Sequence, residues 1–129
     1  MLATVGITLG ALVGPILLMP VEFFFPYPAF VEEIYKFQII DKKTKDAAKP
    51  LIAGLIFAVS ETILYINQIL GKQYGGKIIA ERLVFTTIMH STTMLIIYFG
   101  KKRGQKWGIF GLLTAIIIHT IYNTSLKIF

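Results

Sequence analysis

Residues 29–41 read AFVEEIYKFQIID, and the rest of the chain is best understood outward from this stretch. It places two adjacent carboxylates, Glu32 and Glu33, and the cation Lys36 in a chain that is otherwise strongly apolar. Ionised side chains inside a bilayer are costly and usually mark a functional site. Apolar residues recur every three or four positions through the same stretch, which predicts a short helix over 29–41.

The remaining sequence is apolar enough to cross a bilayer several times. Of the 129 residues, 55% are hydrophobic and only 16% are charged, and the mean hydropathy is +0.70. A soluble domain of this size carries about 25% charged residues. Four stretches approach the ~20 residues needed for a span, and they are residues 1–19, 51–70, 78–99 and 107–126.

The sequence therefore predicts an all-α fold, a polytopic membrane helix bundle that forms one transmembrane domain over residues 1–129. Residues 29–41 would add a short re-entrant or interfacial helix to the four spans. Proline at position 20 should end the first span. The aromatic stretch 21–28, VEFFFPYP, should then turn at the membrane interface.

The net charge of +6 is concentrated in two loops, residues 42–49 and 101–106, and both adjoin predicted spans. Basic residues next to spans favour the cytoplasmic side. This distribution predicts a multi-pass protein of the cell membrane that contacts the lipid bilayer, and it argues against a nucleic-acid partner. The chain has no cysteine, so thiol catalysis and disulfides are excluded.

Four ionisable side chains should lie at a similar depth in the membrane. At ~1.5 Å of rise per residue, Glu61, His90 and His119 lie about 15–18 Å from the cytoplasmic ends of their spans. Glu32 lies ~12 Å from the end of its short helix if that helix dips inward. These side chains are therefore predicted to converge into one hydrophilic site within the bilayer.

The residue types at this site suit hydrolysis. A carboxylate and a histidine in a pocket of low polarity can activate water as a general base and then protonate a leaving amine. Asn123 lies one helical turn after His119, so its amide could donate to a developing oxyanion. Two histidines and a glutamate could also hold zinc and leave one position open.

The ordered polar motifs resemble those of PrsW-type intramembrane proteases. That group lies within the wider superfamily of CAAX prenyl proteases and bacteriocin-processing enzymes (CPBP or ABI). The four motifs are, in order, E-E-x-x-K at Glu32, Glu33 and Lys36, F-x-x-x-E at Phe57 and Glu61, an isolated His90, and H-x-x-x-N at His119 and Asn123.

The resemblance implies an α-helical intramembrane endopeptidase acting on a membrane protein or a lipidated peptide. It assigns catalysis to Glu32, Glu33, Glu61, His90, His119 and Asn123. Glu32 is the leading candidate for the base, although the sequence does not separate it from Glu33. His90 would hold the water, and His119 with Asn123 would stabilise the oxyanion. A metal-free, glutamate-dependent mechanism is favoured, with no cofactor, and zinc stays open.

Other functions fit parts of the same pattern. His90 and His119 could be axial ligands of a haem in an electron carrier. Buried glutamates and histidines also serve proton-coupled transporters. A non-catalytic relative is a further alternative. Relatives of the resembled group usually carry more spans, so this chain is either a minimal core or needs a partner, including a second copy of itself.

Overall fold

A computed structural model describes residues 2–25, 27–41, 43–71 and 76–126. The described residues form five α-helices and no strand. The helices are α1 (Leu2–Phe24), α2 (Pro28–Ile39), α3 (Ala48–Gly71), α4 (Gly76–Arg103) and α5 (Gln105–Leu126). Stretches of α1, α3, α4 and α5 are long and apolar enough to cross a membrane. The predicted fold class, four spans and one additional short helix, is confirmed.

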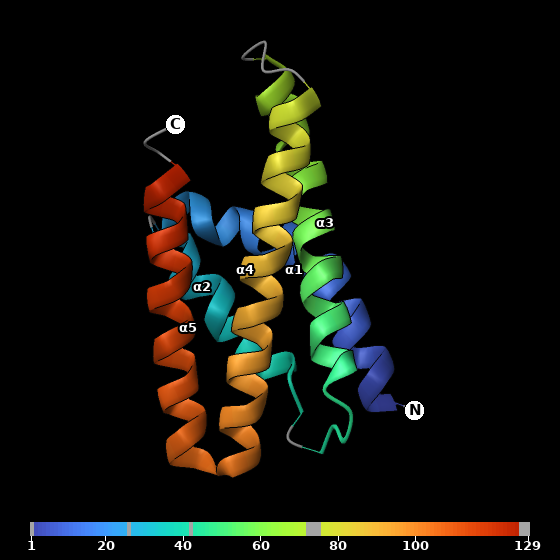
Figure 1. Cartoon of the computed structure of the whole chain (residues 1–129), viewed down its shortest axis with the longest axis vertical. Helices are drawn as coiled ribbons and strands as arrows, with labels where there is room; N and C mark the ends of the chain where they lie inside the picture. Colours follow the sequence, from blue (N-terminus) through green and yellow to red (C-terminus); the bar gives the residue numbers. More distant parts are fainter. Residues whose placement is uncertain (1, 26, 42, 72–75, 127–129) are drawn as a thin grey trace.

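The short helix α2 lies among the long ones. Along the chain, α1 packs against α3, α3 against α4, and α4 against α5 (Figure 1). Helix α2 contacts α1, α4 and α5, and in the described part of the chain it is the element that joins α1 to α5. Four residues of α2 are thereby buried among the spans, and they are Ala29, Glu32, Glu33 and Lys36.

The first helix is longer than the sequence predicted. Helix α1 continues through both Pro15 and Pro20 and ends at Phe24, so the prediction that Pro20 ends the span is wrong. Proline removes one backbone donor, but spans tolerate it because neighbouring helices and local adjustment satisfy the freed carbonyl. The turn into α2 is correspondingly short, and it begins after Phe24 rather than at residue 21.

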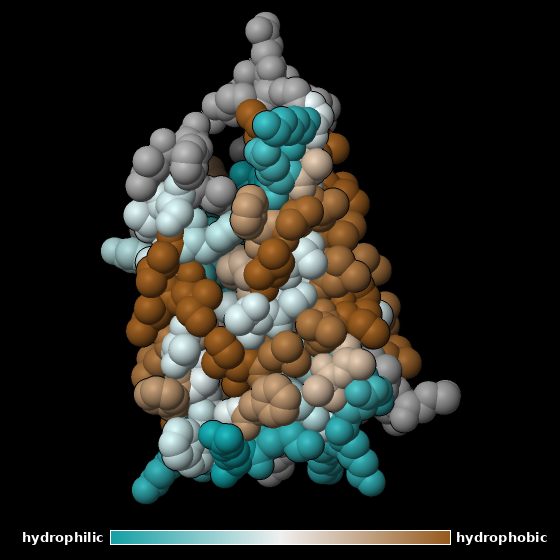
Figure 2. Space-filling model, viewed as in Figure 1, coloured by the Kyte–Doolittle hydropathy of each residue, from teal (hydrophilic) through white to brown (hydrophobic). Residues whose placement is uncertain are grey.

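The outer surface separates apolar from polar residues along the length of the bundle. Apolar side chains cover the flanks, and hydrophilic residues gather at the end that carries the α2–α3 and α4–α5 connections (Figure 2). Lys43, Lys45, Lys102 and Lys106 are exposed there. Both basic loops therefore lie at one end of the molecule, as their charge predicted.

Two long-range contacts fix α2 against the spans. The Tyr35 hydroxyl donates to the Gly10 carbonyl of α1 at 2.9 Å. At the other end, Lys101 of α4 donates to the carbonyl of Phe37 at 2.7 Å and also to that of Ile40. Lysine is well suited to this position because it satisfies carbonyls that a helix leaves unbonded at its C-terminus.

Glycines allow the helices to approach closely at the base of the hairpin between α4 and α5. A Cβ at Gly100 would lie 2.5 Å from the Trp107 carbonyl oxygen, so only glycine fits this contact. Gly104, in the turn itself, has a φ of +125°, a backbone conformation that side chains other than glycine's rarely adopt.

Candidate active site

The structure brings together the ionisable residues that the sequence placed at one depth. Glu32 and Glu33 come from α2, Glu61 from α3, His90 from α4 and His119 from α5. All but Glu61 are buried, with at most 5% of each residue exposed, and Glu61 is partly buried. The predicted convergence is confirmed, whereas the catalytic roles of these residues stay predictions.

Lys36 is the centre of the hydrogen-bond network. Its side chain is fully buried, and Nζ lies 2.5 Å from Glu33 Oε1 and 2.6 Å from His90 Nδ1. It also donates to the Thr93 hydroxyl at 3.3 Å and lies 4.9 Å from the centre of the Phe57 ring. Within the site, Lys36 thus links α2 to α4.

Glu33 is held in its ionised form by two neighbours. Its Oε1 atom lies 2.5 Å from Lys36 Nζ and 2.7 Å from His119 Nδ1. Burial raises the pKa of Glu33, but the charge of Lys36 and the hydrogen bond with His119 outweigh it and lower the pKa to about 2. Glu33 therefore accepts hydrogen bonds from both neighbours and anchors the cluster.

Glu32 is less constrained. Within the described part of the chain, no group hydrogen-bonds its Oε2 atom, which lies 4.0 Å from His90 Nε2. Burial, with the negative charge of Glu61, raises the pKa of Glu32 well above its usual range. The Glu22 carboxyl of α1 lies close to the Glu32 carboxyl. Glu32 is thus a buried carboxyl with one oxygen still open to a donor.

Glu61 links the buried cluster to the outside. Its Oε2 atom lies 2.6 Å from His90 Nε2, and its Oε1 atom lies 3.9 Å from a guanidinium nitrogen of Arg82. The Arg82 guanidinium also lies 5.3 Å from the centre of the Tyr65 ring. The Arg82 side chain therefore turns inward toward Glu61.

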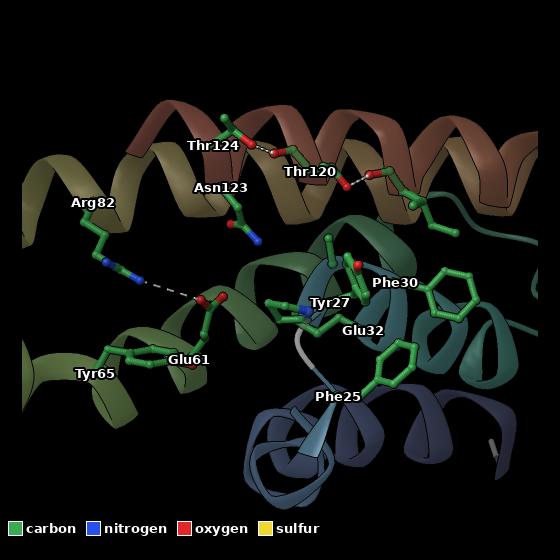
Figure 3. A pocket seen from close by; sticks show the side chains of 13 residues that line it. Phe25, Tyr27, Phe30, Glu32, Glu61, Tyr65, Arg82, Thr120, Asn123 and Thr124 are labelled. Atoms are coloured by element: carbon green, nitrogen blue, oxygen red, sulfur yellow. Dashed lines mark hydrogen bonds and ion pairs between the residues drawn. The ribbon is translucent and has the colours of Figure 1, made fainter. Parts of the chain in front are cut away.

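A cavity of about 700 Å³ opens onto Glu32 and Glu61 (Figure 3). Its lining residues come from the α1–α2 turn and from α2, α3, α4 and α5, and they are Phe25, Tyr27, Pro28, Ala29, Phe30, Glu32, Glu61, Tyr65, Arg82, Ile116, Thr120, Asn123 and Thr124. Asn123 thus shares the cavity with Glu32 and Glu61. His90 and His119, with 0% and 1% of each residue exposed, lie behind the glutamates and not on the cavity wall.

Three contributors were missed by the sequence analysis. Lys36 was noticed only as part of a motif, Glu22 fell in the stretch expected to turn at the interface, and Arg82 was given no role. The signal for Glu22 was present, since an acid in an apolar stretch is a functional candidate by default. Pattern alone gave no means of deciding that Lys36 points inward.

Helix α3 carries Glu61 past α4 at very short range. A Cβ at Gly54 would lie 2.5 Å from the Ser91 Cα and 2.9 Å from the carbonyl carbon of His90. Only a residue without a side chain lets the α4 backbone approach at this point. Gly54 therefore sets the distance over which Glu61 reaches His90.

One subset of the cluster has the spacing of a metal site. Glu32, His90 and His119 each offer one ligand atom, and these three atoms lie within 4.8 Å of one another. A glutamate with two histidines is a donor set that zinc accepts in hydrolytic enzymes. The three residues could therefore hold a divalent ion.

Comparison with known proteins identifies a family for the chain. No curated protein and no solved structure matches the chain significantly. Residues 50–129, which include α4, α5 and nearly all of α3, match the family model of the PrsW family intramembrane metalloproteases. The matched region contains Glu61, His90, His119 and Asn123. The chain belongs to the PrsW family of intramembrane proteases.

Proposed function

We propose that the protein hydrolyses a peptide bond of a membrane-associated substrate, with Glu32 as the base that activates water. The observation that carries this proposal is the position of Glu32. The residue lines the cavity and is 5% exposed, and one buried oxygen of its carboxyl has no hydrogen-bond partner among the described residues. A base of raised pKa close to a substrate cavity is suited to taking and returning a proton near neutral pH.

The reaction needs two proton transfers. Glu32 takes a proton from water as the oxygen attacks the carbonyl carbon of the substrate, which forms a tetrahedral intermediate with an oxyanion. Glu32 then gives this proton to the amine nitrogen as the carbon–nitrogen bond breaks. The Asn123 amide, on the wall of the same cavity, donates to the oxyanion. Water is consumed, and one carboxyl and one amine terminus are formed.

The favoured version of this mechanism is metal-free. A divalent ion bound by Glu32, His90 and His119 would lower the pKa of water and polarise the carbonyl. The spacing of the three donors fits such an ion, but the surroundings of His90 do not. Lys36 Nζ lies 2.6 Å from His90 Nδ1, so a buried cation already contacts this ligand candidate. That ring nitrogen is therefore not available to a metal ion.

The cavity suits a peptide segment in contact with lipid. Phe25, Tyr27 and Phe30 form an aromatic end, while Thr120 and Asn123 of α5 present hydrogen-bonding groups (Figure 3). In the described part of the chain α5 contacts α2 and α4 but not α1 or α3, so one side of the cavity is bordered by a single span. We propose a membrane protein or lipidated peptide of the cell membrane as substrate.

Two further parts of the proposal concern relatives and assembly. The order of the motifs favours a place in the wider CAAX protease and bacteriocin-processing superfamily. A homo-oligomer or a partner subunit stays a prediction. The haem alternative is disfavoured by geometry, because the His90 and His119 rings pack edge to face with centres 5.2 Å apart and leave no room for a macrocycle.

The test is proteolysis by the purified protein in lipid, with a panel of membrane-inserted and prenylated peptides. Glu32→Gln should lower turnover by ~10²–10⁴-fold, the usual contribution of a general base. Glu81→Gln is the matched control, because the Glu81 side chain is 53% exposed and lies outside the cavity. Mass spectrometry identifies the cleaved bond, and thermal unfolding shows whether each variant is folded.

Two results would change the proposal. Full activity of the Glu32→Gln variant would remove Glu32 from the mechanism. Activity that is abolished by a chelator and restored by zinc would replace the metal-free version with a metal-dependent one.

A further inference from the structure

We infer that Lys36 and Glu33 hold the two buried histidines in opposite tautomers, with the proton on Nε2 in His90 and on Nδ1 in His119. The positions of the two protons follow from which neighbouring atoms can only donate a hydrogen bond and which can only accept one. It assigns the two histidines different chemical roles, although both are buried and their rings touch.

The tautomer of His90 follows from Lys36. An ammonium has three donors and no acceptor. Lys36 is kept charged by its ion pair with Glu33 at 2.5 Å, since a buried cation is stable only when it is paired. The His90 Nδ1 atom, 2.6 Å from Nζ, must therefore accept. A neutral ring then carries its proton on Nε2, where the Glu61 carboxylate accepts it at 2.6 Å.

The tautomer of His119 follows from Glu33. An ionised carboxylate is an acceptor only. Its Oε1 atom lies 2.7 Å from His119 Nδ1, so this nitrogen must donate. The ion pair with Lys36 Nζ at 2.5 Å favours the ionised form of this carboxylate. The second ring nitrogen of a neutral His119 then keeps a free lone pair.

These assignments separate the roles of the histidines in the reaction, a step that rests on the proposed protease function. His90 is a positioning residue that donates to Glu61 on the cavity wall. Lys36 is a positioning residue that acts through His90. His119 is the histidine with a free lone pair, so it can take a proton but cannot donate from Nε2 to an oxyanion. This reverses the role that the family resemblance suggested for His119.

The tautomers can be measured without any substrate. The wild-type protein is labelled with ¹⁵N-histidine, placed in lipid nanodiscs and studied by NMR, in which protonated and unprotonated ring nitrogens have well-separated shifts. His90→Gln and His119→Gln variants assign the two sets of signals. The expected result is a protonated Nε2 in His90 and a protonated Nδ1 in His119. A proton on Nδ1 of His90 or on Nε2 of His119 would overturn the inference.

Variants of Lys36 test the cause. Lys36→Met removes the donor to His90 Nδ1, so the proton of His90 should no longer be confined to Nε2. The tautomer of His119 should stay unchanged, and activity should fall by at least ~10²-fold. Lys36→Arg retains a charged donor and should restore the His90 pattern. Lys77→Met is the control, because the Lys77 side chain is 86% exposed. An unchanged His90 signal in a folded Lys36→Met protein would show that Lys36 does not set the tautomer.

The two proposals can fail separately. If the tautomers are as expected and no peptide is cleaved, the hydrogen-bond assignment stands and the protease function falls. If peptides are cleaved and His90 carries its proton on Nδ1, the function stands and the inference falls. Should Lys36→Met fail to fold, the wild-type spectrum alone decides the tautomers.

Discussion

Replacing Gly54 by alanine should push α3 away from α4 at the level of His90. The added Cβ would lie 2.5 Å from the Ser91 Cα. Unbonded carbons are most stable at ~3.5–4.0 Å, so the two helices must move apart by about 1 Å. The bond from His90 Nε2 to Glu61 Oε2, now 2.6 Å, joins the same helices and would lengthen to about 3.6 Å.

The cost of this change can be estimated for stability and activity separately. Overpacking costs ~1–3 kcal/mol, and the higher helix propensity of alanine offsets up to ~1 kcal/mol of it. A misplacement of ~1 Å can reduce turnover by ~10²-fold. We therefore expect Gly54→Ala to lower activity much more than it lowers stability.

The assay compares peptide cleavage and thermal unfolding of Gly54→Ala with those of Gly6→Ala. A Cβ at Gly6 would meet no atom within 4 Å, so this second variant makes the same chemical change without the clash. It should be fully active and as stable as the parent or more so. A Gly54→Ala protein with full activity and full stability would refute the close approach of α3 and α4.

Three other predictions follow from the same geometry. Asn123→Ala should lower turnover by at most ~10²–10³-fold with little change in stability, measured by the peptide assay, if its amide is one oxyanion donor among several. Gly111→Leu should reduce activity and thermal stability together, because even a Cβ there would lie 2.9 Å from the Ile96 carbonyl oxygen of α4, and α5 carries His119. Glu33, whose pKa is lowered from 4.5 to about 2, should contribute stability that is complete above about pH 4.5 and lost as the pH falls toward 2. In thermal unfolding at a series of pH values, Glu33→Gln should remove that acid dependence.

The convergence of the four ionisable side chains could be predicted from sequence because the prediction needs only one constant of helix geometry, the rise per residue. Helical rise per residue is nearly fixed, so distance from a charged loop gives depth in the membrane. As this reasoning predicted, the structure brings four side chains together, those of Glu32, Glu61, His90 and His119. Depth says nothing about rotation around a helix axis, however, and the partners of each side chain depend on that rotation.

The remaining errors share one physical origin, the influence of tertiary packing on local signals. Pro20 was expected to end the first helix, but the span continues, and Glu22 therefore reaches Glu32 from α1. Arg82 was given no role in the site, but the Glu61 carboxylate at 3.9 Å offers it an ionic partner. In both cases a contact distant in sequence overrides a local preference.

The brevity of α2 has a consequence for the order in which the protein is assembled in the membrane. At ~1.5 Å per residue its 12 residues extend only about 18 Å, too short to cross a bilayer, and two glutamates and a lysine oppose independent insertion. The four long helices can enter the lipid as separate spans. Helix α2 gains its partners only once Gly10 of α1 and Lys101 of α4 are in place. The last element to dock is thus the one that carries Glu32, so in the newly made chain the cluster of ionisable side chains is complete only after its surroundings are built.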